Sequence, residues 1–388
     1  MSSQAKAAIV GLGITELGKV YGKSALQFGA QAVQLAAEDA GLTLSDVDGL
    51  LVSSGLAGDD LHLNLQTELG MKNLKLLSYI QAYGSTAAAL VQYATMAVES
   101  GMVDTVAVVW ADAPLKENLG AGAAYNQASR GVPGWRGLTA TAGITSANTM
   151  YALAARRHMK KYGTTNDHFG AIAVAQRQWA ELNPLALFRQ PLTLDDYHAS
   201  RWIAEPFHLL DCCMVTNGGI AVIVTSKERA KDLKQPPVGV FGWGQTHPGG
   251  NNMHDENFGL VSGAAISGPI ALKMADTTID EIDVVEVYDC YTYTALVTLE
   301  DYGFAPKGEG GAFLAQPGVL GPGGSLPVNT GGGELSGYYL WGMTPLSEAV
   351  IQARGQGGDR EVEKHDRVMV SGNGGILDHH STLVLGTL

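Results

Sequence analysis

An internal repeat limits the fold of this chain more than any other feature of its sequence. The segment AGLTLSDVDGLLV, which begins at Ala40, aligns without gaps with ADTTIDEIDVVEV, which begins at Ala275. Further along, MVDTVAVV from Met102 aligns with KHDRVMVS from Lys364, in the same order. Each copy reads as a helix end, a short acidic turn and a buried strand. The two copies predict two similar α/β halves related by a pseudo-twofold axis, with a five-stranded sheet in each half.

The hydrophobic pattern of the first half places strands between Ala-rich helices. The apolar runs show little polar alternation, which is typical of parallel strands covered by helices on both faces. We expect strands at Ala7–Val10, Val47–Val52, Thr105–Trp110 and Ile220–Thr225, and helices at Leu26–Ala40 and Ser85–Ser100. The sequence therefore predicts an α/β protein with a large buried core.

The domain organisation follows from the repeat and from one stretch of different composition. Residues 112–205 are rich in Arg, His, Asn, Gln and Tyr, and we interpret them as an inserted loop domain over one end of the sheet. The N-terminal half, residues 1–232, contains this insertion, and the C-terminal half comprises residues 233–388.

Bulk composition excludes several classes of function. The formal net charge of −13 disfavours binding to a nucleic-acid backbone. Three cysteines cannot make a disulfide framework, and without a CxxC pair or an HExxH motif we expect no metal site. No apolar stretch reaches the ~18 residues of a membrane-spanning helix, and the N-terminus lacks the apolar core of a signal peptide. We expect a cytoplasmic protein without a membrane span.

Several longer segments together resemble the thiolase superfamily. The segments are AAIVGLGITELGK, AGLTLSDVDGLLV, LLDCCMVTNGGIAVIVTSKERA, IDEIDVVEVYDCYTYTAL and LPVNTGGGELSG, and they extend over essentially the whole chain. The branch they resemble is that of the thiolase part of sterol carrier protein X. This resemblance implies the thiolase fold, in which two βαβαβαββ halves form five layers in the order α-β-α-β-α.

The catalytic positions are where the chain departs from that family. Tyr83, in the segment AYGSTAAAL, stands where the family has its nucleophilic cysteine. Tyr288, in Tyr-Asp-Cys-Tyr, replaces the histidine of His-Asp-Cys-Phe, and Tyr339 replaces the histidine of Gly-His-Pro. The final Cys-Gly-Gly-Gly loop corresponds to Ser371–Gly375, which has no cysteine.

These replacements change the chemistry that the site can support. Thiolytic acyl transfer needs a thiolate and a base to activate it. A phenol with an ordinary pKa near 10 is a poor substitute, and free cysteines such as Cys212, Cys213 and Cys290 are usually packing residues. A retro-aldol cleavage of a β-hydroxyacyl-CoA needs no covalent nucleophile. It needs a base at the hydroxyl, an acid at Cα, and stabilisation of the thioester enolate.

The tyrosine pattern is similar to that of the thiolase-like acyl-CoA aldolases of steroid side-chain degradation. The resemblance implies that Tyr288 and Tyr339 are the catalytic acid and base, in an order that the sequence leaves open. Tyr338 is the alternative to Tyr339 if the register is off by one, and Tyr83 is expected to fill the former nucleophile pocket. The other residues expected to line the site are Asp289, Asn329, Gly332, Gly374 and Gly375, with glycine amides near the thioester oxygen.

The same resemblance supplies the expected ligands and partners. Acyl-CoA is the substrate, with a steroid or other bulky side chain, and the short product is an acyl-CoA such as propionyl-CoA or acetyl-CoA. No tightly bound cofactor is expected. A homodimer and a small partner with an OB fold and a zinc ribbon are implied. Two alternatives stay open: a thiolase or acyltransferase with another nucleophile, and a non-catalytic subunit of a complex.

Overall fold

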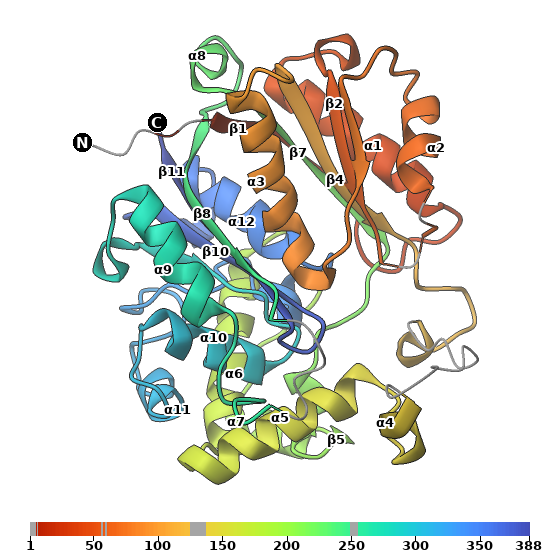
Figure 1. The fold of residues 1–388 in the computed structure, drawn as a ribbon. Helices are drawn as coiled ribbons and strands as arrows, with labels where there is room; N and C mark the ends of the chain where they lie inside the picture. Colours follow the sequence, from red (N-terminus) through yellow and green to blue (C-terminus); the bar gives the residue numbers. More distant parts are fainter. Residues whose placement is uncertain (1–4, 6, 56, 59, 125–136, 249–254) are drawn as a thin grey trace.

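The computed structural model describes residue 5 and residues 7–55, 57–58, 60–124, 137–248 and 255–388. One large mixed sheet forms the centre of the molecule (Figure 1). Its strands are β1 (Ala7–Ile14), β2 (Gly49–Ser53), β3 (Leu76–Tyr79), β4 (Thr105–Asp112), β7 (Gly218–Ser226), β8 (Val238–Thr246), β9 (Val284–Glu286), β10 (Arg367–Gly374) and β11 (His379–Thr387). A separate small hairpin pairs β5 (Trp202–Ala204) with β6 (Phe207–His208).

The two halves of the large sheet have equivalent strands in mirrored order. The strand order runs β3-β2-β4-β7-β1 and then β8-β11-β10-β9. The two runs meet where β1 pairs antiparallel with β8, with Ala7 opposite Val240. The repeated segments of the sequence become the equivalent pairs β2 and β9, and β4 and β10. This arrangement confirms a thiolase-like α/β fold with a pseudo-twofold relation.

The two halves of the sheet differ in one detail from the sequence-based expectation. The first half has five strands, whereas the second has four described strands. A single bridge between Val285 and Val328 stands where the fifth strand is expected. Asn329 follows this bridge with a φ of +50°, so the chain turns away from the sheet before a strand can form.

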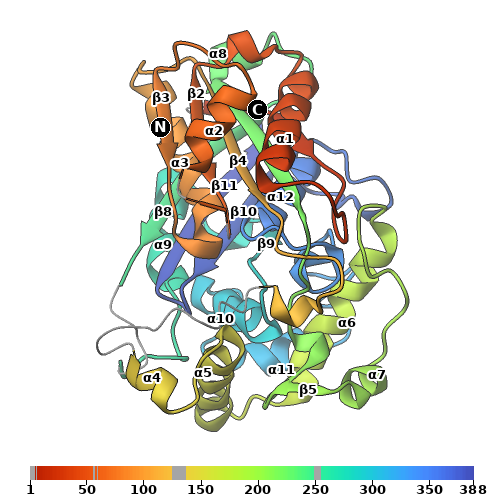
Figure 2. The same ribbon diagram turned by 90° about the vertical axis from the view of Figure 1, so that its right-hand side faces the viewer.

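Helices cover both outer faces of the sheet and fill the space between its halves. They are α1 (Ala25–Ala40), α2 (Leu61–Glu68), α3 (Thr86–Glu99), α8 (Lys227–Ala230), α9 (Ala264–Ala275), α10 (Thr292–Tyr302) and α12 (Met343–Ala353), whereas α11 (Gly310–Leu314) packs on α10. The central pair, α3 and α12, shares one apolar core with the inner strand faces, while α1 and α2 cover the first half and α9 and α10 the second (Figures 1 and 2). The result is the expected sequence of five layers.

Local sequence explains how closely the first helix approaches the sheet. Ser24 and Gln27 form a capping box at the start of α1, and Gly41, with a φ of 74°, ends the helix. On β1, a Cβ at Gly11 would overlap the Ala36 carbonyl oxygen, and a Cβ at Gly13 would overlap the helix backbone nearby. These two glycines therefore let the helix lie directly on the strand.

The insertion lies beyond one end of the sheet, at the bottom of Figure 1. Its described helices are α4 (Gly137–Thr141), α5 (Ala147–Tyr162), α6 (Asn166–Leu182) and α7 (Leu194–Ala199). The buried imidazole of His158 on α5 lies 3.1 Å from the Glu300 carboxylate on α10 and ties the insertion to the second half. The domain boundaries at 112–205 and at 232/233 stay predictions. Within the described ranges, no helix is long and apolar enough to cross a membrane.

Candidate active site

Two phenols meet at the carboxyl end of strand β9. Tyr288 follows the strand by two residues, and Tyr339 lies in the loop before α12. Their hydroxyl oxygens are 3.2 Å apart, within hydrogen-bond distance. Both side chains are buried, with 5% of Tyr288 and 8% of Tyr339 exposed. The structure thus brings together the two residues that the sequence selected as an acid and a base, which are 51 positions apart in the chain.

Backbone contacts hold both tyrosines in place. The Tyr288 amide donates to the Ser371 carbonyl on β10 at 3.2 Å. The Thr216 hydroxyl donates to the Tyr339 carbonyl. Gly84 lies against the Tyr288 ring, and a Cβ at this position would overlap both that ring and the Asn373 carbonyl. The glycine in the former nucleophile loop is therefore required by the close approach of a phenol.

Tyr338 is excluded as the alternative to Tyr339. Its side chain points into the central core, and its hydroxyl lies 2.8 Å from the Ser347 hydroxyl on α12. Successive residues of this extended segment face opposite sides, so one tyrosine serves packing while the other reaches Tyr288. The sequence could not decide between them because the preceding turn, Gly333–Gly337, is an irregular π-helical one.

Tyr83 does not fill a closed pocket, which differs from the expectation. It begins the short turn before α3 with a φ of +54°, and half of its side chain is exposed. Its ring stacks against the rings of Trp341 and His379, with a centroid separation of 6.1 Å in each case. A Cβ added at Gly374 would lie only 2.7 Å from the Cβ of Tyr83, so this position packs closely against Tyr83. Gly375 turns the chain with a φ of 63°.

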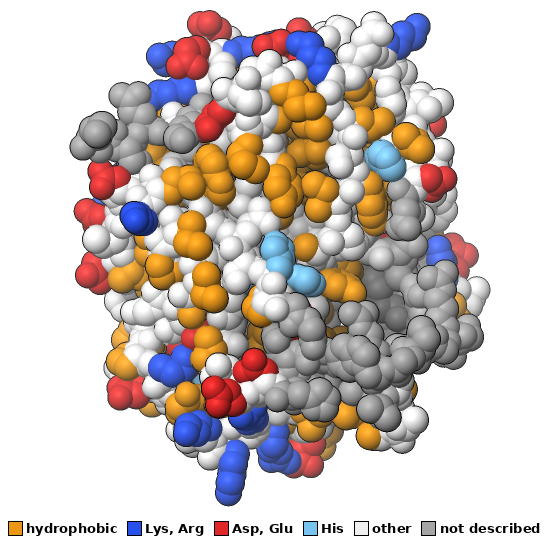
Figure 3. Space-filling model, in the orientation of Figure 1, with side chains coloured by type: hydrophobic (Ala, Val, Ile, Leu, Met, Phe, Trp, Pro, Cys, Tyr) orange, Lys and Arg blue, Asp and Glu red, His pale blue; other side chains and the backbone are white. Residues whose placement is uncertain are grey.

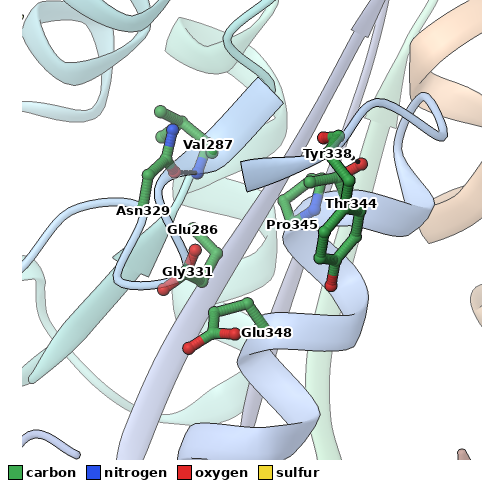
Figure 4. A pocket seen from close by; sticks show the side chains of 9 residues that line it. Glu286, Val287, Asn329, Gly331, Tyr338, Thr344, Pro345 and Glu348 are labelled. Carbon is green, nitrogen blue, oxygen red and sulfur yellow. Dashed lines mark hydrogen bonds between the residues drawn. The ribbon is translucent and has the colours of Figure 1, made fainter. Parts of the chain in front are cut away.

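The loop that begins at Asn329 lies behind the tyrosine pair. The Val287 amide donates to the Asn329 side-chain oxygen at 2.7 Å, a contact visible in Figure 4. A cavity of about 10 Å³ lies beside this loop, lined by Asn329, Tyr338 and the carboxyl groups of Glu286 and Glu348 (Figure 4). It has room for about one water molecule, so it is too small for substrate.

Gly332 continues this loop with a φ of 91°, and its ideal Cβ position lies 2.6 Å from the Ala180 side chain. Asn329 and Gly332 are both buried, and neither lines a cavity of substrate size among the described residues, so their place in the active site stays a prediction.

Asp289 and Glu334 form a buried acidic pair that adjoins the tyrosines. The Glu334 amide donates to the Asp289 carboxylate at 2.8 Å, and both side chains are fully buried. Burial raises the pKa of Asp289 to about 7, although several backbone amide hydrogen bonds oppose the shift. Sequence analysis missed Glu334. The signal that could have found it is an isolated acidic residue in the glycine-rich segment GGGELSG.

The ionisation of the site disfavours both a thiolate and a resting phenolate. Burial raises the pKa of the Cys213 and Cys290 thiols well above their ordinary value of 9.0. Burial, with Tyr339 and Glu334 nearby, also raises the pKa of the Tyr288 phenol well above 10.0. These groups are neutral near pH 7. Among the described residues, no group of three or more His, Cys, Asp or Glu side chains could hold a metal ion.

Comparison with known proteins identifies the family. Residues 244–387 match the thiolase C-terminal domain-like family. A steroid side-chain-cleaving aldolase from Thermomonospora curvata is 36% identical over 381 residues, which span 95% of this chain and 95% of the aldolase. The chain belongs to the thiolase superfamily. The resemblance inferred from the motifs is thereby confirmed.

Two further relatives lie in the same branch of the superfamily. A 17-hydroxy-3-oxo-4-pregnene-20-carboxyl-CoA lyase from Mycobacterium tuberculosis is 36% identical over 364 residues, 90% of this chain and 92% of the lyase. A solved Ltp2-ChsH2(DUF35) aldolase superimposes with a TM-score of 0.87 at 32% identity and covers 100% of this chain and 99% of its own. This superfamily member therefore resembles carbon–carbon lyases over its full length.

Proposed function

We propose that this protein is an acyl-CoA aldolase that cleaves the Cα–Cβ bond of a β-hydroxyacyl-CoA. The observation that carries the proposal is the buried contact between the Tyr288 and Tyr339 hydroxyls at 3.2 Å. By the sequence resemblance, both tyrosines stand at histidine positions of the thiolases, and their contact contains no thiol. Two phenols can carry protons but are poor acyl acceptors, so the site supports cleavage without an acyl-enzyme.

The geometry of the pair suits a retro-aldol reaction. In a β-hydroxyacyl-CoA, the oxygen that loses a proton and the carbon that gains one are separated by a single carbon atom. Phenols in hydrogen-bond contact can therefore reach both atoms at once. In this contact one phenol donates to the other, and the phenol that accepts keeps its own proton.

The proposed proton inventory is balanced. The β-hydroxyl gives its proton to one phenol, which passes its own proton across the 3.2 Å contact to the second phenol, as the Cα–Cβ bond breaks and the β-carbon becomes a ketone or aldehyde. The bonding electrons move to the thioester as an enolate, which the second phenol protonates at Cα to give a short acyl-CoA. The net change is the transfer of one proton from oxygen to carbon. Amide groups of the glycine loops at Gly374 and Gly375 are proposed to stabilise the enolate oxygen.

The substrate class and partners extend this proposal. The relatives named above act on steroid side chains or a pregnene-carboxyl-CoA, so we propose a steroid or similarly bulky alicyclic acyl-CoA that releases propionyl-CoA or acetyl-CoA. The solved relative is named as an aldolase of Ltp2 with ChsH2, a DUF35 protein. On that basis a DUF35 partner is proposed here, and the sequence resemblance adds that it is small and carries an OB fold and a zinc ribbon. A cytoplasmic location is proposed from the sequence.

A homodimer is proposed from the sequence resemblance and from one exposed surface. Apolar side chains gather on the face shown in Figure 3, on the side where Figure 1 draws α3 and α9. The exposed apolar residues of these two helices include Tyr93 and Met96 of α3 and Ile266, Ile270 and Met274 of α9. Each of them is between 36% and 53% exposed. Apolar faces of this kind are usually covered by another chain.

Product analysis tests the proposal. The purified protein, alone and with its DUF35 partner, is incubated with a steroid β-hydroxyacyl-CoA that carries a tertiary hydroxyl group. We expect one ketone and one short acyl-CoA in equal amounts by liquid chromatography and mass spectrometry, with no requirement for free CoA. If the reaction instead depends on free CoA and yields a shortened acyl-CoA from a β-ketoacyl-CoA substrate, the protein is a thiolase and the proposed aldolase function is wrong.

A further inference from the structure

Several strained backbone positions of this protein lie close to the tyrosine pair. Among the described residues, eight other than glycine have a positive φ, a conformation that residues with a Cβ rarely adopt. Four of the eight are Asn or Asp, which tolerate this conformation. The other four are large and apolar, with φ between 51° and 71°, and they are Tyr83, Trp341, Ile376 and Leu377. Strain of this kind is concentrated at binding and catalytic sites, so these four positions point to a ligand.

The four strained residues belong to three loops that meet beside the tyrosine pair. Tyr83 begins the turn before α3. Trp341 lies two residues after Tyr339, in the loop before α12. Residues 376–377 lie in the turn that joins β10 to β11. Each loop therefore brings its strained residue to the same end of the large sheet.

Direct contacts join these loops to Tyr288. A Cβ added at Gly84, which follows Tyr83 in the chain, would lie 2.3 Å from both the Cε2 and the Cζ atom of Tyr288. Cζ is the ring carbon that bears the phenolic hydroxyl. A Cβ added at Gly374 would lie 2.7 Å from the Cβ of Tyr83, and Trp341 packs against the same apolar core as the tyrosine pair. The backbone beside Tyr83 thus lies against the reacting end of Tyr288.

The aromatic rings of these loops form a partly exposed surface. The Tyr83 ring lies nearly parallel to the Trp341 ring and to the His379 imidazole, with a centroid separation of 6.1 Å and an interplanar angle of 20° in each case. Trp341 is anchored in turn by the buried ring of Trp110, at 5.6 Å. The side chain of Tyr83 nevertheless stays 50% exposed. A ring fixed on a strained backbone but left half exposed gains little from burial, so folding alone does not explain it.

The proposed substrate brings its bulky part to this place. In a β-hydroxyacyl-CoA with an alicyclic side chain, the ring system includes the β-carbon or is bonded to it. The hydroxyl group on that carbon must reach Tyr288 and Tyr339, so the rings begin within a bond or two of the phenols. Flat apolar rings pack well against the faces of aromatic side chains.

We propose that Tyr83, Trp341 and His379 form a ring-binding surface that holds the alicyclic ring system of the acyl group, an inference that rests on the proposed aldolase function. The surface takes no part in proton transfer. It binds a face of the ring system and positions the β-carbon at the tyrosine pair, so it determines which acyl-CoA is cleaved. Because the three loops fix these side chains before the substrate arrives, little conformational freedom is lost on binding.

Two substrates test the ring-binding surface in the full-length protein with its proposed partner. One is a steroid β-hydroxyacyl-CoA with a tertiary hydroxyl group, and the other carries two methyl groups on the β-carbon in place of the rings. The quantity compared is the ratio of kcat/KM for the steroid substrate to kcat/KM for the ring-free substrate. KM, kcat and the melting temperature are recorded for each variant.

The variants separate the ring of Tyr83 from its hydroxyl group and from its role in folding. Tyr83→Gly removes the ring and suits the φ of +54°, so the variant should stay folded. Tyr83→Phe removes only the hydroxyl group. Trp202→Leu is the matched control, because Trp202 is likewise half exposed, at 52%, and stacks on His208 at 3.7 Å, but it belongs to the β5–β6 hairpin.

The expected pattern is a loss of substrate preference. We expect Tyr83→Gly to lower the ratio by about tenfold or more, mainly through a higher KM for the steroid substrate, because one aromatic face is lost. Tyr83→Phe and Trp202→Leu should each keep the ratio within about threefold of the parent's. The melting temperature of Tyr83→Gly should stay close to that of the parent, since glycine relieves the strain at this position.

A fall in the ratio of less than about tenfold in Tyr83→Gly would overturn the ring-binding surface. Equal losses on the two substrates would overturn it as well, because Tyr83 would then be a structural residue or a contact of the CoA part. An equally large fall in Tyr83→Phe or in Trp202→Leu would also contradict it. If the parent cleaves neither substrate, the proposed function fails. If the parent cleaves both and Tyr83→Gly keeps the parent's ratio, only the ring-binding surface fails.

Discussion

Replacing each active-site tyrosine with phenylalanine, singly and together, should reveal that Tyr288 and Tyr339 act as one unit. The two hydroxyl oxygens are 3.2 Å apart in a buried site, so removing either one breaks the same proton path. The substitutions remove a single oxygen each and leave both rings in the core. The variants are therefore expected to stay folded.

The size of the effect follows from the role assigned to the pair. A positioned acid or base contributes roughly 10²–10⁴-fold, or about 3–5 kcal/mol of transition-state stabilisation. If the phenols acted independently, the double variant would lose the product of the two single losses. Because the two phenols share one proton path, we expect the kcat of the double variant to lie within about tenfold of the kcat of the less active single variant. The lost hydrogen bond should cost only about 1 kcal/mol of folding stability.

The assay is a double-mutant cycle on kcat at saturating substrate, with melting temperatures measured in parallel. Tyr338→Phe is the matched control, since Tyr338 is similarly buried and its hydroxyl contacts Ser347 at 2.8 Å instead of the active pair. It should keep kcat within about threefold of the parent. Strictly multiplicative losses for Tyr288→Phe and Tyr339→Phe would contradict the shared proton path, and so would a control as impaired as they are.

Two further expectations concern packing and pH. Gly84→Ala should lower kcat strongly and destabilise the fold by about 1–3 kcal/mol, because the new Cβ overlaps the Tyr288 ring and a rigid backbone carbonyl. Gly122→Ala, where the new Cβ would meet nothing within 4 Å, is its control, and equal behaviour of the two variants would refute the packing argument. For Asp289, the pKa in the folded protein is about 7 against 3.8 for the free group, so the native state binds the proton more tightly. The unfolding free energy should therefore fall as pH rises through this interval, by on the order of 4 kcal/mol, and Asp289→Asn should remove that component in denaturant titrations at pH 4 and pH 8.

The fold could be predicted from the sequence because short local patterns determine where its strands and helices form. The apolar strand at Val47–Val52 and its repeat from Ile282 appear as β2 and β9, and the Ala-rich helices appear within one residue of their expected ends. In these elements, each residue's neighbours in sequence already determine where it lies. The pairing of Tyr288 with Tyr339 or Tyr338 came instead from the family resemblance, which brings together the two histidine positions that they occupy.

Other features depend on tertiary packing and could not be anticipated. Whether Tyr338 or Tyr339 faces the site depends on an irregular turn whose geometry no periodicity encodes. The half-exposed ring of Tyr83 reflects stacking on Trp341 and His379, which are distant in sequence. The burial of Glu334 without a partner is a property of the folded core alone. In the second half, a single bridge at Val328, between Pro327 and the positive φ of Asn329, likewise stands in place of a fifth strand.

The central claim is that phenols have replaced a covalent nucleophile, and intact-protein mass spectrometry tests it most directly. The protein of 40.7 kDa is quenched in acid during turnover of a β-hydroxyacyl-CoA and, separately, after incubation with a short acyl-CoA. We expect the unmodified mass in both samples, while the short acyl-CoA formed in deuterated water carries one deuterium at Cα. An acyl adduct that maps to Cys212, Cys213 or Cys290 would contradict the account.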